Sequence, residues 1–384
     1  MLTFVAFCSL AGLLIVWVVY PLVIAALASL LAHRRRSART AVAYEPWVSV
    51  IIATRDDPDT IKRRIANCLE SSYDPAKLQV VIAVDRCVAT AQWRELASMD
   101  DRVTFVRGDE PGGKAAALNA AVRTCRGNVL VFGDAHQEWE NDAIRHLVAT
   151  LARPRVGAVS GCLEITETAR RSLAGRYWLF ERWLRCCEAV VHSSVGVTGA
   201  IWAMRANLWS ALPTQLILDD LFTPMQLVMR GHRVAFAAAA RAFETRLHDP
   251  TQEYHRKVRT LTGVIQLCTW LPEVLSPTSN PVWIQFVVHK LLRLLTPYWV
   301  AAITAWIAVA VVRSIAGSLF VGLAIALGVG VVAAFAAKSN VVKIARETIV
   351  SAALLQAAAV VGTVNGFRGR WNVWHTEPSS TGGA

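Results

Sequence analysis

The sequence predicts an α/β domain with a mostly parallel central sheet, joined to transmembrane helices at both ends. Three observations support this fold class. The 384 residues are 54% hydrophobic with a mean hydropathy of +0.39, yet 18% are charged, so apolar and charged residues must be segregated along the chain. Apolar blocks lie at residues 2–32 and from Trp283 onward. Between them, short β-rich runs alternate with runs of helical periodicity.

The N-terminal apolar run, residues 2–32, carries no charge and predicts a transmembrane helix. At 1.5 Å per residue it exceeds the roughly 30 Å of a bilayer core. A cleaved signal peptide is the alternative, but no basic residue precedes the run and it is about twice the usual length of such a signal. Arg34, Arg35, Arg36 and Arg39 follow it, and the positive-inside rule assigns this flank to the cytoplasm.

The middle section predicts four strands, at 48–54, 78–84, 103–107 and 128–134. Helices are expected between them in "DTIKRRIANCLES", "TAQWRELASM" and "GKAAALNAAVRTC", because apolar residues recur there at helical spacing. Strands separated by helices usually pair in parallel, and such sheets bind ligands beyond the carboxyl ends of their strands. A binding site is therefore expected among the residues that directly follow these strands.

Acidic side chains follow three of the four strands. Asp56 and Asp57 come after the first, Asp85 after the second, and Asp134 with His136 after the fourth. A single aspartate there would mean little, and Asp57 by itself is equally compatible with a helix N-cap. Three acidic strand ends that meet at one edge of a sheet favour a polar binding site.

The segment "EPGGKAAALNAAV", residues 110–122, places Lys114 in the first turn of a helix after a Gly-Gly turn. Exposed backbone N–H groups, the positive end of the helix and an ammonium together suit phosphate oxygens. The spacing matches neither a P-loop nor the dinucleotide fingerprint, which excludes those two kinds of site.

Taken in order, these segments resemble the family 2 glycosyltransferases, in particular the membrane-bound cellulose, chitin and hyaluronan synthases. The resemblance covers roughly residues 46–300 and rests on "VSVIIATRDD", "VVIAVDRC" and "GGKAAALNAAV". It implies a GT-A-like nucleotide-sugar fold, transfer with inversion, and a UDP-sugar donor. The residues that it implies for the donor include Asp57, Asp85 and Lys114.

The segment "GDAHQEW" stands where this family has its Asp-x-Asp motif, so the resemblance implies that Asp134 and His136 hold a divalent cation against the diphosphate. Mg²⁺ and Mn²⁺ both take hard oxygen ligands. Imidazole is a poor ligand for Mg²⁺ but an acceptable one for Mn²⁺, so the histidine favours manganese or a weakened metal site. The alternative is that His136 is only a turn residue.

The segment "LILDDLFTPMQLVMRGHRV", residues 216–234, resembles the family's catalytic acidic pair at the start of a helix. Asp220 is expected to take the proton from the acceptor hydroxyl, and Asp219 replaces the more common glutamate. Two acids at the start of a helix also complement its dipole, which is the structural alternative.

The segment "YHRKVRTLTG" stands where the family has an arginine motif that ends in tryptophan. Arg256 and Arg259 fit the Arg-x-x-Arg frame, and the resemblance implies that they bind the diphosphate. The next residue is Thr260 where the synthases have a tryptophan near the acceptor sugar. This difference weakens the case for processive polymer synthesis without affecting the transfer chemistry.

The C-terminal section predicts interfacial helices followed by further crossings. In "VWIQFVVHKLLRLL" the cations Lys290 and Arg293 are expected to reach toward lipid headgroups. Three apolar runs then end at Arg313, at Lys338 and before Asn365. An odd number of crossings conflicts with the positive-inside rule at the C-terminal arginines, so one segment is open to a re-entrant or interfacial placement.

The predicted organisation has six parts: an N-terminal transmembrane helix (1–32), a basic linker (33–45), a cytosolic glycosyltransferase domain (46–250), interfacial amphipathic helices (251–295), C-terminal transmembrane helices (296–365) and a polar tail (366–384). The net charge of +12 fits basic flanks beside membrane lipids, and no nucleic-acid motif accompanies it.

The function predicted from these features is a multi-pass enzyme of the inner membrane that moves a sugar from a UDP-sugar to a polysaccharide or lipid-linked acceptor at the cytoplasmic face, with Mn²⁺ or Mg²⁺. A non-processive transferase that forms a glycolipid is the alternative within the class. A catalytically silent member that binds nucleotide sugar within an export complex is another. So few crossings would need a homo-oligomer or an export partner to line a polymer channel.

Overall fold

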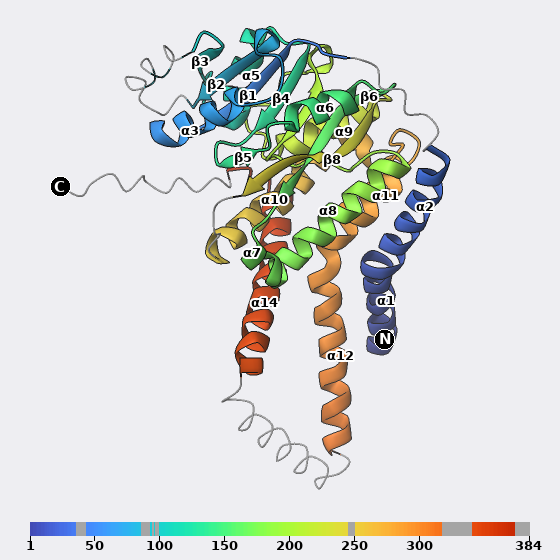
Figure 1. Ribbon diagram of the computed structural model, residues 1–384. Coiled ribbons are helices and arrows are strands. Elements are labelled where there is room, and N and C mark those ends of the chain that lie inside the picture. The colour runs from blue at the N-terminus through green and yellow to red at the C-terminus, as the bar shows by residue number, and fades with distance from the viewer. Residues whose placement is uncertain are drawn as a thin grey trace, which may run out of the picture.

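The computed structural model describes residues 1–35, 44–85, 93, 96, 100–244, 250–316 and 340–372. The expected helix in "TAQWRELASM" and the predicted crossing that ends at Lys338 lie mainly outside the described residues. So do the middle of the 33–45 linker and most of the 366–384 tail. The described residues form an α/β domain with long helices extending from one end of it (Figure 1).

Eight strands of the described chain form one mixed sheet in the order β3-β2-β1-β4-β7-β6-β8-β5. Four of their seven pairings are parallel, namely β1 with β2 and β4, β2 with β3, and β6 with β8. The others are antiparallel. The strands are β1 Val48–Thr54, β2 Leu78–Val84, β3 Val103–Arg107, β4 Val129–Gly133, β5 Gln137–Trp139, β6 Val156–Glu164, β7 Trp202–Arg205 and β8 Arg233–Glu244.

The predicted strands are confirmed, and the mostly parallel sheet with them. The first three have the predicted bounds, and β4 is one residue shorter at each end than 128–134. The remaining four strands were not predicted. The long strand β8 reads "RVAFAAAARAFE", and its alanines are poor strand formers, so its β structure depends on pairing with β5 and β6.

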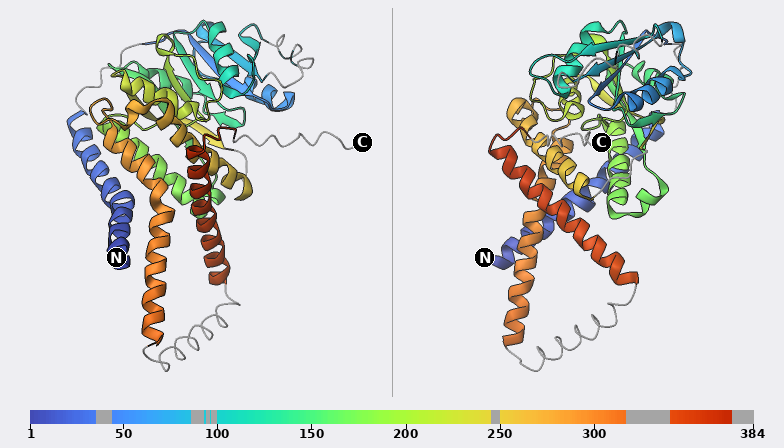
Figure 2. Two further views of the ribbon diagram at one scale, coloured as in Figure 1. Left: turned by 180° about the vertical axis from the view of Figure 1, so that it is seen from behind. Right: turned by 90° about the vertical axis from the view of Figure 1, so that its left-hand side faces the viewer.

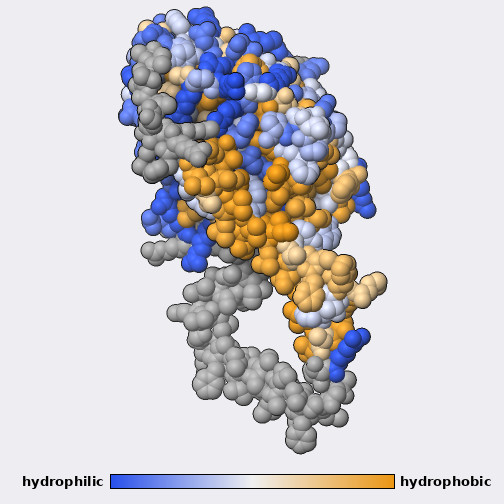
Figure 3. Space-filling view, turned by 90° about the vertical axis from the view of Figure 1, so that its right-hand side faces the viewer, coloured by the Kyte–Doolittle hydropathy of each residue, from blue (hydrophilic) through white to orange (hydrophobic). Residues whose placement is uncertain are grey.

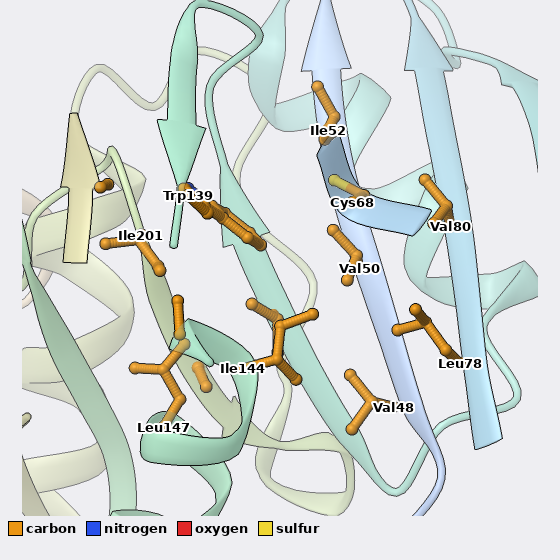
Figure 4. Close-up of a cluster of buried hydrophobic side chains, with 14 of the residues drawn as sticks. Val48, Val50, Ile52, Cys68, Leu78, Val80, Trp139, Ile144, Leu147 and Ile201 are labelled. Atoms are coloured by element: carbon orange, nitrogen blue, oxygen red, sulfur yellow. The ribbon is translucent and has the colours of Figure 1, made fainter. Parts of the chain in front are cut away.

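Helices cover both faces of the sheet and create two cores. On one face, Val48, Val50 and Ile52 of β1 pack with Ile144 and Leu147, and Figure 4 shows these side chains together. On the other face, alternate residues of the same strands pack against different helices. The helices of the domain are α3 Pro58–Leu69, α5 Lys114–Thr124, α6 Ala143–Leu151, α7 Glu167–Arg171, α8 Leu173–Val191, α9 Asp219–Met229 and α10 Pro250–Trp270. Burial of both faces explains why the parallel strands read as continuous apolar runs.

Two helices in the described residues are long and apolar enough to cross a membrane, Leu2–Ala32 and Trp283–Arg313, each of 31 residues. Only 22% and 11% of their apolar windows are buried, which distinguishes them from core helices of the domain. The first comprises α1 Leu2–Leu14, a π turn and α2 Tyr20–Arg35. The second comprises α11 Trp283–Phe286, a short irregular stretch and α12 Thr296–Ala316.

The third long helix, α14 Asn340–Phe367, has a shorter apolar part, at Ala353–Phe367. Figure 2 shows α1, α12 and α14 extending from the same end of the α/β domain. In the view of Figure 3, hydrophilic residues gather on the domain and hydrophobic residues on the helical end. Apolar and charged residues are therefore segregated in space as well as along the sequence.

The expectation that Lys290 and Arg293 reach toward lipid headgroups is wrong. Their side chains are 20% and 8% exposed, and both form ion pairs with Glu181 of α8. The predicted interfacial segment also continues directly into α12, because the apolar helix begins at Trp283. The cations turn inward because α8 presents buried carboxylates along this helix.

A buried polar network fixes the first apolar helix to this junction. The Tyr20 hydroxyl donates to Glu188 Oε1 at 2.6 Å, and His289 Nδ1 lies 2.7 Å from the same oxygen. His289 Nε2 lies 3.0 Å from Glu181 Oε2. Because α2, α8 and the helix that contains His289 all contribute, the network holds both candidate membrane helices against the α/β domain.

Candidate active site

One cavity of about 1000 Å³ collects residues from the carboxyl ends of β1, β2 and β4 and from the starts of α5 and α9. The predicted acids Asp85, Asp134 and Asp220 come from different elements and all line it. Because acids separated by up to 135 positions face one space, they can act on a single ligand. The predicted site residues that line the cavity are Asp85, Lys114, Asp134, His136, Asp219, Asp220, Arg256 and Arg259.

Asp85 joins two of the predicted donor-binding segments. Its Oδ2 accepts a hydrogen bond from Arg55 Nε at 2.7 Å and another from the Gly113 backbone N–H at 3.0 Å. Gly113 has φ of +91°, in the region that favours glycine, which accounts for the Gly-Gly turn before α5. The end of β2 and the start of α5 are thereby held together at the cavity.

Asp57 is not among the residues that line the cavity. Its carboxylate caps α3, accepting from the Thr60 N–H at 2.9 Å and from the Thr60 hydroxyl at 2.7 Å. These hydrogen bonds lower the pKa of Asp57. The Asp57-Pro58 pair was a sequence signal for this role, since proline is frequent at the first position of a helix. Asp56 lines the cavity in its place.

Lys114 connects the two acidic segments. Its Nζ lies 3.2 Å from Asp134 Oδ1 and 3.2 Å from Asp219 Oδ1. Burial alone would lower the pKa of this ammonium, but the surrounding carboxylates outweigh burial and raise its pKa above the ordinary value. The lysine therefore stays charged and offsets the repulsion between the acids at the end of β4 and those at the start of α9.

Asp220 has the properties of a general base near neutral pH. Burial, and then the charge of Asp219, raise the pKa of Asp220 to about 6, against the opposing effect of Lys114. A carboxylate with a pKa near the working pH transfers protons efficiently. Burial lowers the pKa of Arg259 and the charge of Asp220 opposes this effect, so the acid and the arginine interact electrostatically.

Open space separates the two carboxylates that face the cavity. A Cβ atom placed on Gly199 would lie 3.5 Å from Asp220 Oδ2 and 3.6 Å from Asp134 Oδ2, with no closer contact. The two oxygens therefore flank the same glycine. This arrangement leaves room for a ligand between the acid that follows β4 and the acid that begins α9.

The donor set around Asp134 suits a cation that is shared with a ligand. Among the described residues, no three His, Cys, Asp or Glu side chains group closely enough to hold a metal ion themselves. His136 Nε2 lies 2.8 Å from Asp56 Oδ1, while the Asp134 side chain is 42% exposed. Divalent cations at phosphate sites are commonly held by one or two carboxylates plus the phosphate oxygens, and Asp134 fits that mode.

The two predicted arginines occupy one side of α10. Arg256 Nη2 lies 2.6 Å from Glu253 Oε2, and Arg259 lies in the field of Asp220 and Asp134. Thr260, which stands in place of the tryptophan, also lines the cavity, and its hydroxyl donates to the Arg256 carbonyl at 2.8 Å. Both arginines line the cavity, and Glu253 holds the guanidinium group of Arg256 in place there.

Sequence reasoning missed the end of the cavity that lies nearest to the apolar helices. Tyr177, Glu181 and Arg185 line it from α8, with Lys257 opposite on α10. The signal in the sequence was the spacing of the three α8 residues at i, i+4 and i+8, which puts them on one helix face. The spacing does not show what this face of α8 packs against, and in the structure the face lines the cavity.

Comparison with known proteins places these features in a family. The family model described as "Glycosyltransferase like family 2" matches residues 46–269, more than half of the chain. An N-acetylglucosaminyltransferase of Azorhizobium caulinodans is 26% identical over 153 residues, which are 39% of this chain and 38% of that protein. A beta-monoglucosyldiacylglycerol synthase of a Nostoc strain is 27% identical over 118 residues, 30% of this chain and 25% of that protein. The chain thus spans well under half the length of these curated relatives.

A solved structure shows the same fold. The mannosyltransferase PcManGT from Pyrobaculum calidifontis, determined in complex with GDP-Man and Mn²⁺, superimposes with a TM-score of 0.72 at 22% identity. The match covers 96% of this chain and 100% of that chain. The predicted fold class, a GT-A-like α/β domain with attached apolar helices, is confirmed.

Proposed function

The chain belongs to the family 2-like glycosyltransferases, and from that membership we propose that it transfers a sugar, with inversion, from a UDP-sugar to a hydroxyl of a membrane-associated acceptor. The observation that carries the proposal is the group formed by Lys114, Asp134, Asp219 and Asp220 in one cavity. Such a group combines a cation for phosphate, a carboxylate for a metal ion and a base for the acceptor.

Each part of the reaction has a residue in this cavity. Asp220 accepts the proton of the acceptor hydroxyl as that oxygen attacks the anomeric carbon, opposite the leaving diphosphate. Lys114 and Arg259 stabilise the negative charge that develops on the leaving group. Asp219 holds Lys114 in place and raises the pKa of Asp220. A divalent cation, held by Asp134 together with the diphosphate oxygens, would neutralise further charge there.

The donor is proposed as a UDP-sugar because "VSVIIATRDD" resembles the uridine-contacting turn of the synthases, and Asp85 stands where that family contacts the base or ribose. The mannosyltransferase with the same fold was solved with GDP-Man, so a donor test must include guanosine diphosphate sugars. Mn²⁺ is the first cation to test, because His136 stands beside Asp134 and that structure contains Mn²⁺.

The acceptor is proposed as lipid-linked, and the enzyme as an inner-membrane protein with its α/β domain in the cytoplasm. Two candidate membrane helices and the arginines after residue 32 support this placement. Thr260 in place of the tryptophan favours a single transfer over processive synthesis. The Nostoc relative, named as a glucolipid synthase, agrees with a lipid acceptor.

The experiment is donor profiling of the full chain in detergent with Mn²⁺, comparing the wild type with Asp220→Asn. We expect the wild type to release nucleoside diphosphate from one of the donors. The variant should bind the same donor with similar affinity and transfer sugar about 10²–10⁴-fold more slowly. Arg241→Gln, an exposed change on β8, serves as the matched control. Donor binding without turnover in the wild type would instead favour a catalytically silent member.

A further inference from the structure

The cavity extends beyond the proposed transfer site to the apolar helices. Past Asp220 its wall includes Trp17 from the first apolar helix, Tyr177 from α8, and Leu355 and Ala359 from α14. About 1000 Å³ is at the upper limit of small-molecule pockets, so the cavity has room for an acceptor head group as well as a donor. Both candidate membrane helices contribute to its far end, the first through Trp17 and the second through Lys290 and Arg293.

Cations dominate this end. Arg185, Lys257, Lys290 and Arg293 all line it, and we call these four residues the cationic end. The carboxylate beside them, Glu181, pairs with His289 and Arg293 and lies 3.9 Å from Lys290 Nζ. Glu188 and Glu253 also act on these cations, and Glu253 is shared with Arg256. Among the described residues, five cations therefore face three carboxylates, which leaves this end with excess positive charge.

Two of the guanidinium groups keep buried N–H donors without a protein acceptor. Arg185 is 8% exposed, and its Nε has no hydrogen-bond partner; its guanidinium lies 5.2 Å from the centre of the Trp178 ring. The Arg293 side chain is also 8% exposed, and its Nε and Nη2 have no partner. A buried charged donor without a hydrogen-bond partner destabilises the folded protein. A ligand that carries acceptor oxygens would satisfy these donors.

Lys257 adds an ammonium that is weakly paired. Its Nζ lies 4.4 Å from the centre of the Tyr177 ring and 3.8 Å from Glu253 Oε1, an oxygen beyond hydrogen-bond distance. Burial, followed by the nearby charge of Arg256, lowers the pKa of Lys257 to about 8. An anionic ligand would relieve this repulsion as well as satisfy the guanidinium donors.

We propose that the cationic end binds a phosphate or pyrophosphate group that links the accepting sugar to a lipid tail. The inference rests on the proposed glycosyltransferase function and specifies its acceptor as an anionic lipid-linked saccharide. Apolar residues of α1–α2 and α14 beside the cations would receive the start of the tail. The accepting hydroxyl would then lie farther into the cavity, toward Asp220.

The bonds that change lie away from the linking phosphate. The hydroxyl oxygen of the accepting sugar bonds to the anomeric carbon of the donor, and its proton passes to Asp220. The bond from that carbon to the diphosphate oxygen breaks, and its electron pair leaves with the nucleoside diphosphate. The linking phosphate is unchanged and serves only to position the acceptor.

The test compares two acceptors with the same sugar and the same long isoprenoid tail, one linked by pyrophosphate and the other by an uncharged ether. The full chain is assayed in nanodiscs as wild type, Lys257→Met, Lys290→Met and the control Arg241→Gln. We expect the wild type and the control to prefer the pyrophosphate-linked acceptor by about tenfold or more in kcat/KM. Each lysine variant should reduce that preference about tenfold, through KM more than kcat.

A second measurement makes the result independent of turnover. Binding of the pyrophosphate-linked acceptor is measured in Asp220→Asn nanodiscs with and without Lys257→Met, and the added change should weaken binding about tenfold. The inference is overturned if the wild type has the same kcat/KM with both acceptors. It is also overturned if each lysine variant lowers kcat/KM by the same factor with both acceptors. Nucleoside diphosphate release from each donor is measured alongside, in the presence of either acceptor. Its absence with every donor contradicts the proposed function itself, whereas release with no acceptor preference contradicts only this inference.

Discussion

At the scale of single residues, the site consists of acids that lie close together and a lysine whose positive charge offsets their mutual repulsion. Lys114 contacts Asp134 and Asp219, while burial and then the charge of Asp219 raise the pKa of Asp220. Strained electrostatics of this kind are typical of functional sites, because a structural role would not require like charges in one cavity.

The raised pKa of Asp220 predicts the acid limb of the pH profile. A general base must be deprotonated, so kcat/KM should rise with pH through about 6 and level off above it. The measurement is a pH profile of transfer at subsaturating acceptor. An acid limb near pH 4, the ordinary range of an aspartate, would contradict the role assigned to this residue.

The same shift predicts that removal of the charge stabilises the fold. Because the folded-state pKa of Asp220 lies above its unfolded value of 3.8, protonation favours the folded state, and stability falls as the pH rises toward 6. Asp220→Asn should therefore raise the unfolding free energy at pH 7.5 by about 1–2 kcal/mol. Thermal unfolding in detergent should show a Tm higher by about 2–4 °C per kcal/mol. An unchanged or lower Tm would show that the charged form is not strained.

The residues that line the cavity could be predicted only where a local sequence pattern placed them at its edge. Asp85, Lys114, Asp134 and Asp220 follow strands or begin helices, so their segments pointed to one edge of the sheet. The choice between Asp56 and Asp57 required the backbone geometry of the turn, which caps α3 with the second of them. The partners of His289 could not be predicted, because they depend on how α8 packs.

At the scale of elements, α10 positions the arginines, and α14 positions α10. The backbones of the two helices approach closely at Gly362 and Gly366. A Cβ on Gly362 would lie 2.9 Å from Leu261 Cβ, and one on Gly366 would lie 2.6 Å from Ile265 Cβ. The Thr262 hydroxyl also lies 3.3 Å from the Gly362 carbonyl oxygen. Small residues four positions apart permit such close helix packing.

Gly362→Leu should therefore displace α10, and with it Arg259, which lines the cavity. We expect transfer to fall about tenfold or more and donor binding to weaken less than that, because Arg259 moves while Asp85 lies on a different element. Val364→Leu, an exposed change on the same helix, is the matched control. The measurement is kcat/KM for transfer beside the donor dissociation constant. Wild-type transfer in Gly362→Leu would show that α14 does not support the site.

The elements that the sequence predicted well are those with strong local signals. The strands β1 and β2 are apolar runs bounded by turn residues, and α5 begins after a Gly-Gly turn. The alanine-rich strand β8 has no such signal and is specified by its neighbours in the sheet. The helix that contains His289 resembles an interfacial helix in sequence, because the pattern shows its cations but not the buried carboxylates of α8 that pair with them.

At the scale of the whole molecule, the cavity connects two environments. Residues at the strand ends of a GT-A-like domain line one part of it, and residues of the apolar helices line another. The buried contacts among Tyr20, Glu188 and His289 hold these two parts together.

The central claim is that acids and cations from distant segments form one site for a nucleoside diphosphate sugar and its acceptor. The most direct measurement is an experimental structure of the full chain in nanodiscs. The sample contains Mn²⁺ and a non-hydrolysable analogue of the donor that the wild type uses. We predict that the diphosphate lies among Lys114, Asp134 and Arg259 and that the anomeric carbon faces Asp220. A nucleotide bound elsewhere, or an anomeric carbon turned away from Asp220, would contradict this account.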